Sequence, residues 1–270
     1  MVDRICISIN NRCNLACKYC HFRKKHNVVS EEMNVFEILD NAKSYAKGMF
    51  KIGFVGNGEC FLDWPILKAY VAYLEGYPNI KAYTITNGTV KLEDEDWEFL
   101  ENHGVNVGFS IDGYKELHDA NRCGSFDRAM SNVADYKRVT GHFPTFNATV
   151  GRESLDNASR VIEFFKPFGT RVTFSRMIGD QGISLVEYRN FLHAAEKELP
   201  IRRGSLDCTM YGGQCGAGTN NFFFANGKIY YCGNCIDLPP IGPSGIPFEE
   251  LERISLGFDR NKCYKESICE

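Results

Sequence analysis

The chain alternates six times between a short β-type run and a helical stretch. The β-type runs, rich in β-branched and aromatic residues, lie near residues 4–10, 51–56, 80–86, 105–111, 144–150 and 170–176. The helical stretches follow them, near residues 31–47, 64–75, 93–102, 125–139, 153–166 and 184–198. Six β-then-α units in series predict an α/β fold with parallel strands and outer helices. Such a sheet either closes into a full or partial barrel or opens into a doubly wound sheet.

The first helical stretch has the spacing of a helix that buries one face. Val35, Ile38, Leu39 and Ala42 recur at intervals of one, three and four residues. Ser30 stands before the stretch and is a suitable N-cap, because its hydroxyl can accept a hydrogen bond from the first turn. We therefore expect this helix to begin near Ser30.

The character of the sequence changes after about residue 200. Glycine, asparagine, proline and cysteine crowd together, and regular periodicity is confined to the fragment FFFANGKIYYC. This fragment predicts a β-hairpin that turns at Asn226–Gly227. We expect an α/β domain over residues 1–200 and a small cysteine-rich domain over residues 201–270, held together through its cysteines.

Charge and hydropathy argue against several classes of protein. The formal net charge of −3 gives no electrostatic reason for a nucleic-acid or anionic-membrane partner. The N-terminus has no apolar segment typical of a signal peptide, and no run approaches the roughly 18 apolar residues of a membrane span. We expect a cytoplasmic protein that binds neither nucleic acid nor membrane.

The chain contains 12 cysteines, which is unusual for a cytosolic protein of this size. Clustered cysteines in such a protein more often bind metal than form disulfides. Three lie between residues 13 and 20, and six lie between residues 208 and 269. This distribution predicts one metal site near each end of the chain.

The N-terminal cysteines form the motif Cys13-x3-Cys17-x2-Cys20 directly after the first β-type run. Three thiolates on one loop can bind three irons of a 4Fe–4S cluster and leave the fourth iron open for another ligand. A four-cysteine zinc site is the alternative, but the next cysteine along the chain is Cys60. The spacing also differs from that of ferredoxins. The motif therefore favours a cluster with one open iron.

The residues around these cysteines, NNRCNLACKYCHF, resemble the cluster loop of the radical S-adenosylmethionine (radical SAM) superfamily, with Tyr19 as the aromatic residue before the third cysteine. The resemblance continues at the ends of later β-type runs. Gly56-Asn57-Gly58-Glu59 resembles the family's Gly-Gly-Glu motif, although Asn57 replaces the second residue. The segment from Ser110 to Arg122, with the sequence SIDGYKELHDANR, resembles sulfatase-maturating and peptide-modifying members.

The resemblance implies a partial (β/α)6 barrel of the TIM type with S-adenosylmethionine bound at its mouth. It implies that Glu59 binds the methionine amino group and that Ser110 and Arg122 bind the carboxylate, which suits a guanidinium. Asp112 then lies near the ribose, and Asn147 and Val150 near the adenine. The complete set of candidate cofactor-binding residues is Tyr19, Gly56, Gly58, Glu59, Asn87, Ser110, Asp112, Arg122, Asn147 and Val150.

The C-terminal cysteines resemble the auxiliary-cluster (SPASM or twitch) domains of the family, in which a hairpin separates the first two ligands. The resemblance implies one auxiliary 4Fe–4S cluster. Its expected ligands are Cys215, Cys232, Cys263 and Cys269, with Cys208 as a substitute. A zinc site on Cys208, Cys215, Cys232 and Cys235 is the alternative.

Three further cysteines are candidate catalytic residues, namely Cys60, Cys123 and Cys235. A thiol that faces the substrate can return a hydrogen atom to a substrate radical, which an epimerase requires. Inert packing is the alternative for each, because free cysteine often behaves as a small buried hydrophobe.

The resemblance implies that an external electron donor of the flavodoxin or ferredoxin type reduces the N-terminal cluster. The cluster then cleaves S-adenosylmethionine to a 5′-deoxyadenosyl radical, which abstracts hydrogen from a substrate. The Ser110–Arg122 segment favours a ribosomally made peptide or protein as that substrate. A dehydrogenase or epimerase of a sugar or aminoglycoside-like alcohol is the alternative. A simple electron carrier would not need a six-unit α/β body with Glu59 and Arg122 at its mouth.

Overall fold

A nine-stranded sheet forms the centre of the computed structural model, which describes residues 1–20, 22, 32–177, 182–201 and 216–257. The strand order is β6-β5-β4-β3-β2-β1-β7-β8-β9. The first six strands are parallel to their neighbours and lie in sequence order: β1 (Arg4–Ile7), β2 (Phe50–Phe54), β3 (Ile80–Thr86), β4 (Asn106–Ser110), β5 (Thr145–Val150) and β6 (Val172–Arg176). A sequential order places every crossover on one face, so the partial barrel is confirmed and a doubly wound sheet is excluded.

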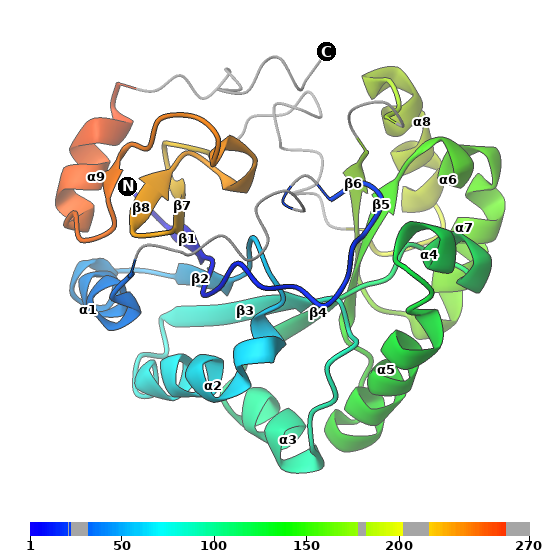
Figure 1. The fold of residues 1–270 in the computed structure, drawn as a ribbon, viewed down its shortest axis with the longest axis horizontal. Helices are drawn as coiled ribbons and strands as arrows, with labels where there is room; N and C mark the ends of the chain where they lie inside the picture. Colours follow the sequence, from blue (N-terminus) through cyan, green and yellow to red (C-terminus); the bar gives the residue numbers. More distant parts are fainter. Residues whose placement is uncertain (21, 23–31, 178–181, 202–215, 258–270) are drawn as a thin grey trace.

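Eight helices surround the arc of these strands (Figure 1). They are α1 (Val35–Tyr45), α2 (Trp64–Tyr73), α3 (Asp94–Asn102), α4 (Lys115–Asn121), α5 (Phe126–Thr140), α6 (Arg152–Asp156), α7 (Ala158–Phe165) and α8 (Leu185–Glu196). Alternate strand residues such as Ile5, Ile7, Ile52 and Phe54 are fully buried in the core on the helix side. The side chains between them point into the interior of the barrel, because successive side chains of a strand point in opposite directions.

The chain after residue 216 adds strands to the same sheet. β7 (Asn221–Ala225) pairs in parallel with β1, and β8 (Lys228–Tyr230) returns antiparallel to it and pairs with the short β9 (Gly242–Pro243). The predicted turn at Asn226–Gly227 is confirmed, with φ of +52° and +70°, as two-residue hairpin loops require. The sheet thus runs across the expected boundary at residue 200, and the division into two domains stays a prediction.

Several predicted helices differ in detail from those observed. α1 buries the four predicted apolar residues, but its N-cap is Asn34, whose side chain accepts a hydrogen bond from Glu37 N–H. The predicted start at Ser30 is therefore wrong, and Ser30 itself lies outside the described residues. The stretch predicted over 153–166 is divided at Asn157 into α6 and α7.

Two helices were not predicted, α4 and α9 (Phe248–Ser255). Both are too short for a clear periodic pattern, and α9 lies in the glycine- and proline-rich part of the sequence. It is held by tertiary packing, because Phe248 stacks on Phe50 with ring centroids 5.8 Å apart. Within the described ranges, no helix has both the length and the apolar character needed to cross a membrane.

Candidate active site

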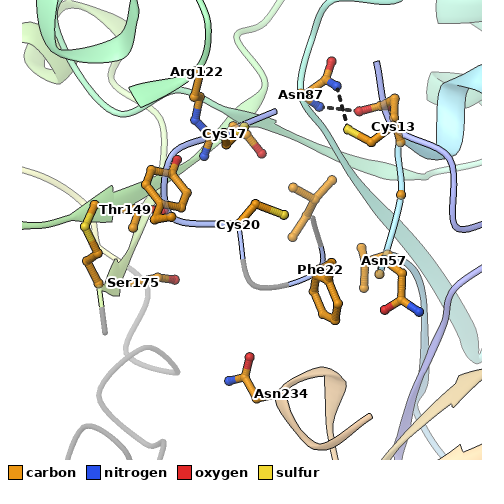
Figure 2. Close-up of a pocket in the computed structure, with 18 of the residues that line it drawn as sticks. Cys13, Cys17, Cys20, Phe22, Asn57, Asn87, Arg122, Thr149, Ser175 and Asn234 are labelled. Atoms are coloured by element: carbon orange, nitrogen blue, oxygen red, sulfur yellow. Dashed lines mark hydrogen bonds between the residues drawn. The ribbon is translucent and has the colours of Figure 1, made fainter. Parts of the chain in front are cut away.

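The carboxyl ends of the parallel strands surround a cavity of about 400 Å³. It is lined by Cys13, Cys17, Tyr19, Cys20, Phe22, Val55, Gly56, Asn57, Gly58, Glu59, Ile85, Asn87, Ser110, Arg122, Thr149, Ser175, Arg176, Met177 and Asn234. Barrel enzymes place their active sites at this end of the strands. The cavity is therefore the candidate active site, and Figure 2 shows the side chains that surround it.

Cys13, Cys17 and Cys20 lie along one side of the cavity (Figure 2). All three are free thiols of intermediate exposure. Burial raises the pKa of Cys17 to about 11 and also raises the pKa of Cys13. A bound metal is therefore needed to hold these groups as thiolates at neutral pH.

The three cysteines can supply one ligand to each of three irons of a 4Fe–4S cluster. Among the described residues, no three Cys, His, Asp or Glu side chains converge closely enough to hold one metal ion. A 4Fe–4S cluster instead takes each thiolate on a different iron, which requires the sulfurs to be spread apart. Cys13, Cys17 and Cys20 are free thiols on one loop at the wall of the cavity.

The cysteine loop packs directly against the loop that follows β2. Glu59 N–H donates to the Arg12 carbonyl at 2.7 Å, and Asn10 Nδ2 donates to the Glu59 carbonyl at 3.0 Å. A Cβ on Gly58 would lie 2.0 Å from Asn10 Oδ1 and 2.3 Å from the Arg12 carbonyl oxygen. Glycine is required at this position because the two loops approach so closely.

The carboxylate of Glu59 is buried, with the residue only 2% exposed. Its Oε1 accepts hydrogen bonds from Phe61 N–H at 3.1 Å and Thr86 Oγ1 at 2.8 Å, and its Oε2 accepts one from Asn87 N–H at 2.6 Å. Burial raises the pKa of Glu59, and these hydrogen bonds partly offset that increase. Glu59 therefore joins the loops after β2 and β3 and places an acidic group at the cavity wall.

Arg122 forms the cationic part of the cavity. Its Nη2 lies 3.1 Å from Asp112 Oδ1, and its guanidinium lies over the ring of Tyr19. The hydroxyl of Tyr19 donates to Asp112 Oδ2 at 2.7 Å, and Thr149 N–H donates to Oδ1 at 3.0 Å. Burial alone would lower the pKa of Arg122, but Asp112 more than offsets this effect, and the pKa is raised. Arg122 Nε is buried and has no hydrogen-bond partner within the described chain.

Most of the predicted cofactor-binding residues meet at the cavity, namely Tyr19, Gly56, Gly58, Glu59, Asn87, Ser110 and Arg122. Asp112 does not line it, because its carboxylate is fully buried behind Arg122 and Tyr19. Asn147 and Val150 also do not line it. Val150 is 1% exposed in the core, and the neighbouring Thr149 points into the cavity instead, as strand alternation requires.

Several cavity residues were missed by the sequence prediction, chiefly Thr149, Ser175, Arg176 and Asn234. Ser175 and Arg176 end the sixth parallel strand, so the rule that sites lie at strand ends contained the necessary signal. Asn234 lies in the turn after the hairpin, and only the parallel pairing of β7 with β1 brings it to this cavity.

The three candidate hydrogen donors are not among the residues that line the cavity. Cys60 is buried, with its Sγ 2.9 Å from Thr84 Oγ1, and Cys123 is exposed on a residue with φ of +59°. Cys235 is 2% exposed, and its Sγ lies 3.5 Å from that of Cys232. The expected ligands Cys208, Cys215, Cys263 and Cys269 lie outside the described residues.

Comparison with known proteins places this chain in a family. The model of the Radical SAM superfamily matches residues 7–165. A cysteine-type anaerobic sulfatase-maturating enzyme of Clostridium novyi is 28% identical over 174 residues, which cover 58% of this chain and 46% of that protein. The chain thus spans about half the length of this curated relative.

Solved structures share the fold over most of the chain. Native anSMEcpe with bound AdoMet and Cp18Cys peptide has a TM-score of 0.77 at 20% identity, covering 98% of this chain and 85% of that one. Streptococcus suis SuiB bound to precursor peptide SuiA has a TM-score of 0.74 at 16% identity, covering 93% of this chain and 64% of that one. Together with the family match over more than half of its length, the cysteine loop and the cavity identify this chain as a member of the radical SAM superfamily.

Proposed function

We propose that this enzyme binds S-adenosylmethionine in the cavity beside a 4Fe–4S cluster on Cys13, Cys17 and Cys20, and that it modifies a peptide. The observation that carries the proposal is the convergence of three free cysteines, a buried acid and a buried guanidinium on one cavity. When bound, the reduced cluster and the cofactor supply a 5′-deoxyadenosyl radical that abstracts hydrogen from the substrate. An external donor of the flavodoxin or ferredoxin type supplies the electron.

Different residues of the cavity bind the carboxylate and the ammonium group of the methionine part of S-adenosylmethionine. Arg122, with Ser110 at the end of β4, binds the carboxylate, because a guanidinium is the favoured partner of carboxylates. Glu59 lines the same cavity and supplies negative charge for the ammonium group. The surrounding apolar side chains, Phe22, Val55, Ile85 and Met177, exclude water from the reacting centre.

A peptide is the substrate class that the similar structures favour. Two structural neighbours, anSMEcpe and SuiB, are known with bound peptides, and both share the fold over more than nine-tenths of this chain. A cysteine-type sulfatase-maturating enzyme is among the sequence relatives. The auxiliary cluster is a separate prediction, because three of its four expected ligands lie outside the described residues.

The proposal is tested with the anaerobically reconstituted enzyme, dithionite and S-adenosylmethionine. The expected products are 5′-deoxyadenosine and methionine, formed slowly without substrate. Short peptides encoded beside the gene, prepared fully deuterated, are then added one at a time. Deuterium in 5′-deoxyadenosine identifies a peptide as the hydrogen source. Transfer from deuterated sugars and from none of the peptides would favour a small-molecule enzyme instead.

A further inference from the structure

Asn87 connects the loop after β3 to the first cysteine of the motif. It directly follows β3, is 7% exposed and lines the cavity. Its side-chain Nδ2 lies 3.8 Å from Cys13 Sγ, within hydrogen-bond distance of a sulfur, and Figure 2 marks this contact. The structure thus places an amide donor beside a sulfur that is expected to bind iron.

The orientation of the Asn87 amide is fixed by its other contacts. Its Oδ1 accepts hydrogen bonds from Thr89 N–H at 2.9 Å and from Thr89 Oγ1 at 2.7 Å. Because a backbone N–H can only donate, Oδ1 is the atom that faces Thr89, and Nδ2 is the atom that faces Cys13. One proton of Nδ2 goes to Asn14 Oδ1 at 2.8 Å, which leaves the other proton for the sulfur.

The backbone of Asn87 makes a separate contact. Asn87 N–H donates to Glu59 Oε2 at 2.6 Å, and this hydrogen bond does not involve the Asn87 side chain. A substitution at residue 87 therefore removes the donor to Cys13 and leaves the link between Glu59 and the loop after β3 in place.

We infer that Asn87 donates a hydrogen bond to the Cys13 thiolate of the N-terminal cluster and thereby raises the reduction potential of that cluster. Reduction adds one negative charge, as an electron from the external donor, and a donor proton beside a ligating sulfur stabilises the more negative state. Hydrogen bonds to the sulfurs are among the factors that set the potential of an iron–sulfur cluster. Asn87 is thus a positioning residue that acts through Cys13, and this role rests on the proposed cluster.

The test is a redox titration of the reconstituted enzyme without S-adenosylmethionine, followed by electron paramagnetic resonance of the reduced cluster. The signal of the N-terminal cluster is the part that is lost in the variant without Cys13, Cys17 and Cys20. At a fixed ambient potential, Asn87→Leu is expected to lower the ratio of reduced to oxidised cluster about tenfold, which is about 59 mV for a one-electron couple. Asn87→Asp keeps an acceptor for Thr89 but brings a carboxylate beside the sulfur, so it should lower the ratio further.

Thr89→Val is the matched control. It removes the Thr89 hydroxyl, which contacts both Asn87 and Asn14, while the Thr89 N–H still orients the Asn87 amide. Its ratio of reduced to oxidised cluster should stay within about twofold of the wild type. An equal fall in Thr89→Val and Asn87→Leu would overturn the inference, because the effect would then belong to the loop as a whole.

The two Asn87 variants give the remaining outcomes. Unchanged ratios would overturn the inference, and weaker binding of S-adenosylmethionine with an unchanged ratio would make Asn87 a ligand of the cofactor instead. Iron content and thermal unfolding check that the cluster and the fold are intact, and Asn87→Asp carries the test if Asn87→Leu binds iron poorly. A wild type without a signal that depends on the three cysteines would contradict the proposed function rather than the role of Asn87.

Discussion

Arg122 and Asp112 form a buried ion pair at the cavity wall, with Arg122 Nη2 3.1 Å from Asp112 Oδ1. The Asp112 side chain is fully buried, and its second oxygen accepts a hydrogen bond from Tyr19, the residue before the third cluster cysteine. Asp112 therefore orients Arg122 and ties it to the cysteine loop, while Arg122 Nε has no hydrogen-bond partner among the described residues. One pair thus couples the expected cofactor site to the expected cluster site.

The first prediction separates binding from stability in this pair. Arg122→Ala is expected to weaken S-adenosylmethionine binding by about 1.5–3 kcal/mol, the scale of a hydrogen bond to a charged group. It should also destabilise the fold by about 3–5 kcal/mol, because Asp112 becomes an uncompensated buried charge. Adding Asp112→Asn should restore much of the thermal stability but not the binding, as measured by calorimetry. Wild-type affinity in the double variant would show that Arg122 does not hold the cofactor.

The second prediction concerns the contact between the cysteine loop and the loop after β2. Gly58→Ala forces Asn10 and the Arg12 carbonyl away from the position of the new Cβ. The cysteine loop should shift, and the iron bound per chain after reconstitution should fall well below that of the wild type. Gly48→Ala is the matched control, because its Cβ would meet no atom within 4 Å. Equal iron contents in the two variants would contradict this account of Gly58.

The third prediction counts the irons of the N-terminal site. Replacing Cys13, Cys17 and Cys20 together by alanine should remove about four irons per chain, the content of one 4Fe–4S cluster. It should also abolish formation of 5′-deoxyadenosine. Cys123→Ala, which removes an exposed thiol away from the cavity, should retain the full iron content. An unchanged iron count in the triple variant would mean that the cluster is held elsewhere.

The fourth prediction is a loss of stability in mild acid caused by His118. This residue is fully buried, with Nε2 3.0 Å from Ser125 Oγ, and burial lowers its pKa to about 4 from the usual 6.5. Between these values the unfolded chain binds a proton that the folded chain does not. The contribution of His118 is therefore complete above pH 6.5 and declines as the pH falls toward 4, by at most about 3 kcal/mol.

This pH dependence is measured by urea unfolding between pH 7.5 and 4.5, in the variant without the three cluster cysteines so that acid loss of iron does not interfere. His118→Gln should flatten the dependence of the unfolding free energy on pH. The exposed His193 is the control position, and His193→Gln should keep the original slope. Identical slopes for both variants would assign the acid sensitivity to other groups.

The fifth prediction concerns the cysteine pair after the hairpin. The Sγ atoms of Cys232 and Cys235 are 3.5 Å apart, close to the edge of about 3.8 Å expected for two sulfurs on one tetrahedral ion with bonds of about 2.3 Å. This spacing suits two ligands of one zinc ion, the alternative site, because a 4Fe–4S cluster takes each thiolate on a different iron. Cys235→Ala should lower the metal bound in excess of four irons, as counted by mass spectrometry of iron and zinc. Full retention of that metal would show that Cys235 is a spare thiol.

The same measurement in the wild type identifies the centre. About eight irons per chain indicates the auxiliary cluster, whereas about four irons with one zinc indicates the alternative site.

The sequence by itself determined the succession of strands and helices along the chain and the types of residue that form the cavity. Six apolar strand patterns separated by helical ones permit few parallel arrangements, and the side chains that follow each strand must then meet at one end. The resemblance to the radical SAM superfamily then assigned Cys13, Glu59, Ser110 and Arg122, which are up to 109 residues apart, to one site before any contact was known.

Only the tertiary structure decided which way each side chain points and which distant residues it contacts. Because side chains alternate along β5, Thr149 and not Val150 lines the cavity. Arg122 also forms a buried ion pair with Asp112, which the sequence did not predict. The hydrogen bond from Asn57 Nδ2 to Asn11 Oδ1 joins the ends of two strands, and Asn234 reaches the cavity only because β7 pairs with β1. Periodicity and motifs report the local backbone and residue type, whereas a hydrogen bond between distant side chains depends on the packing of the whole chain.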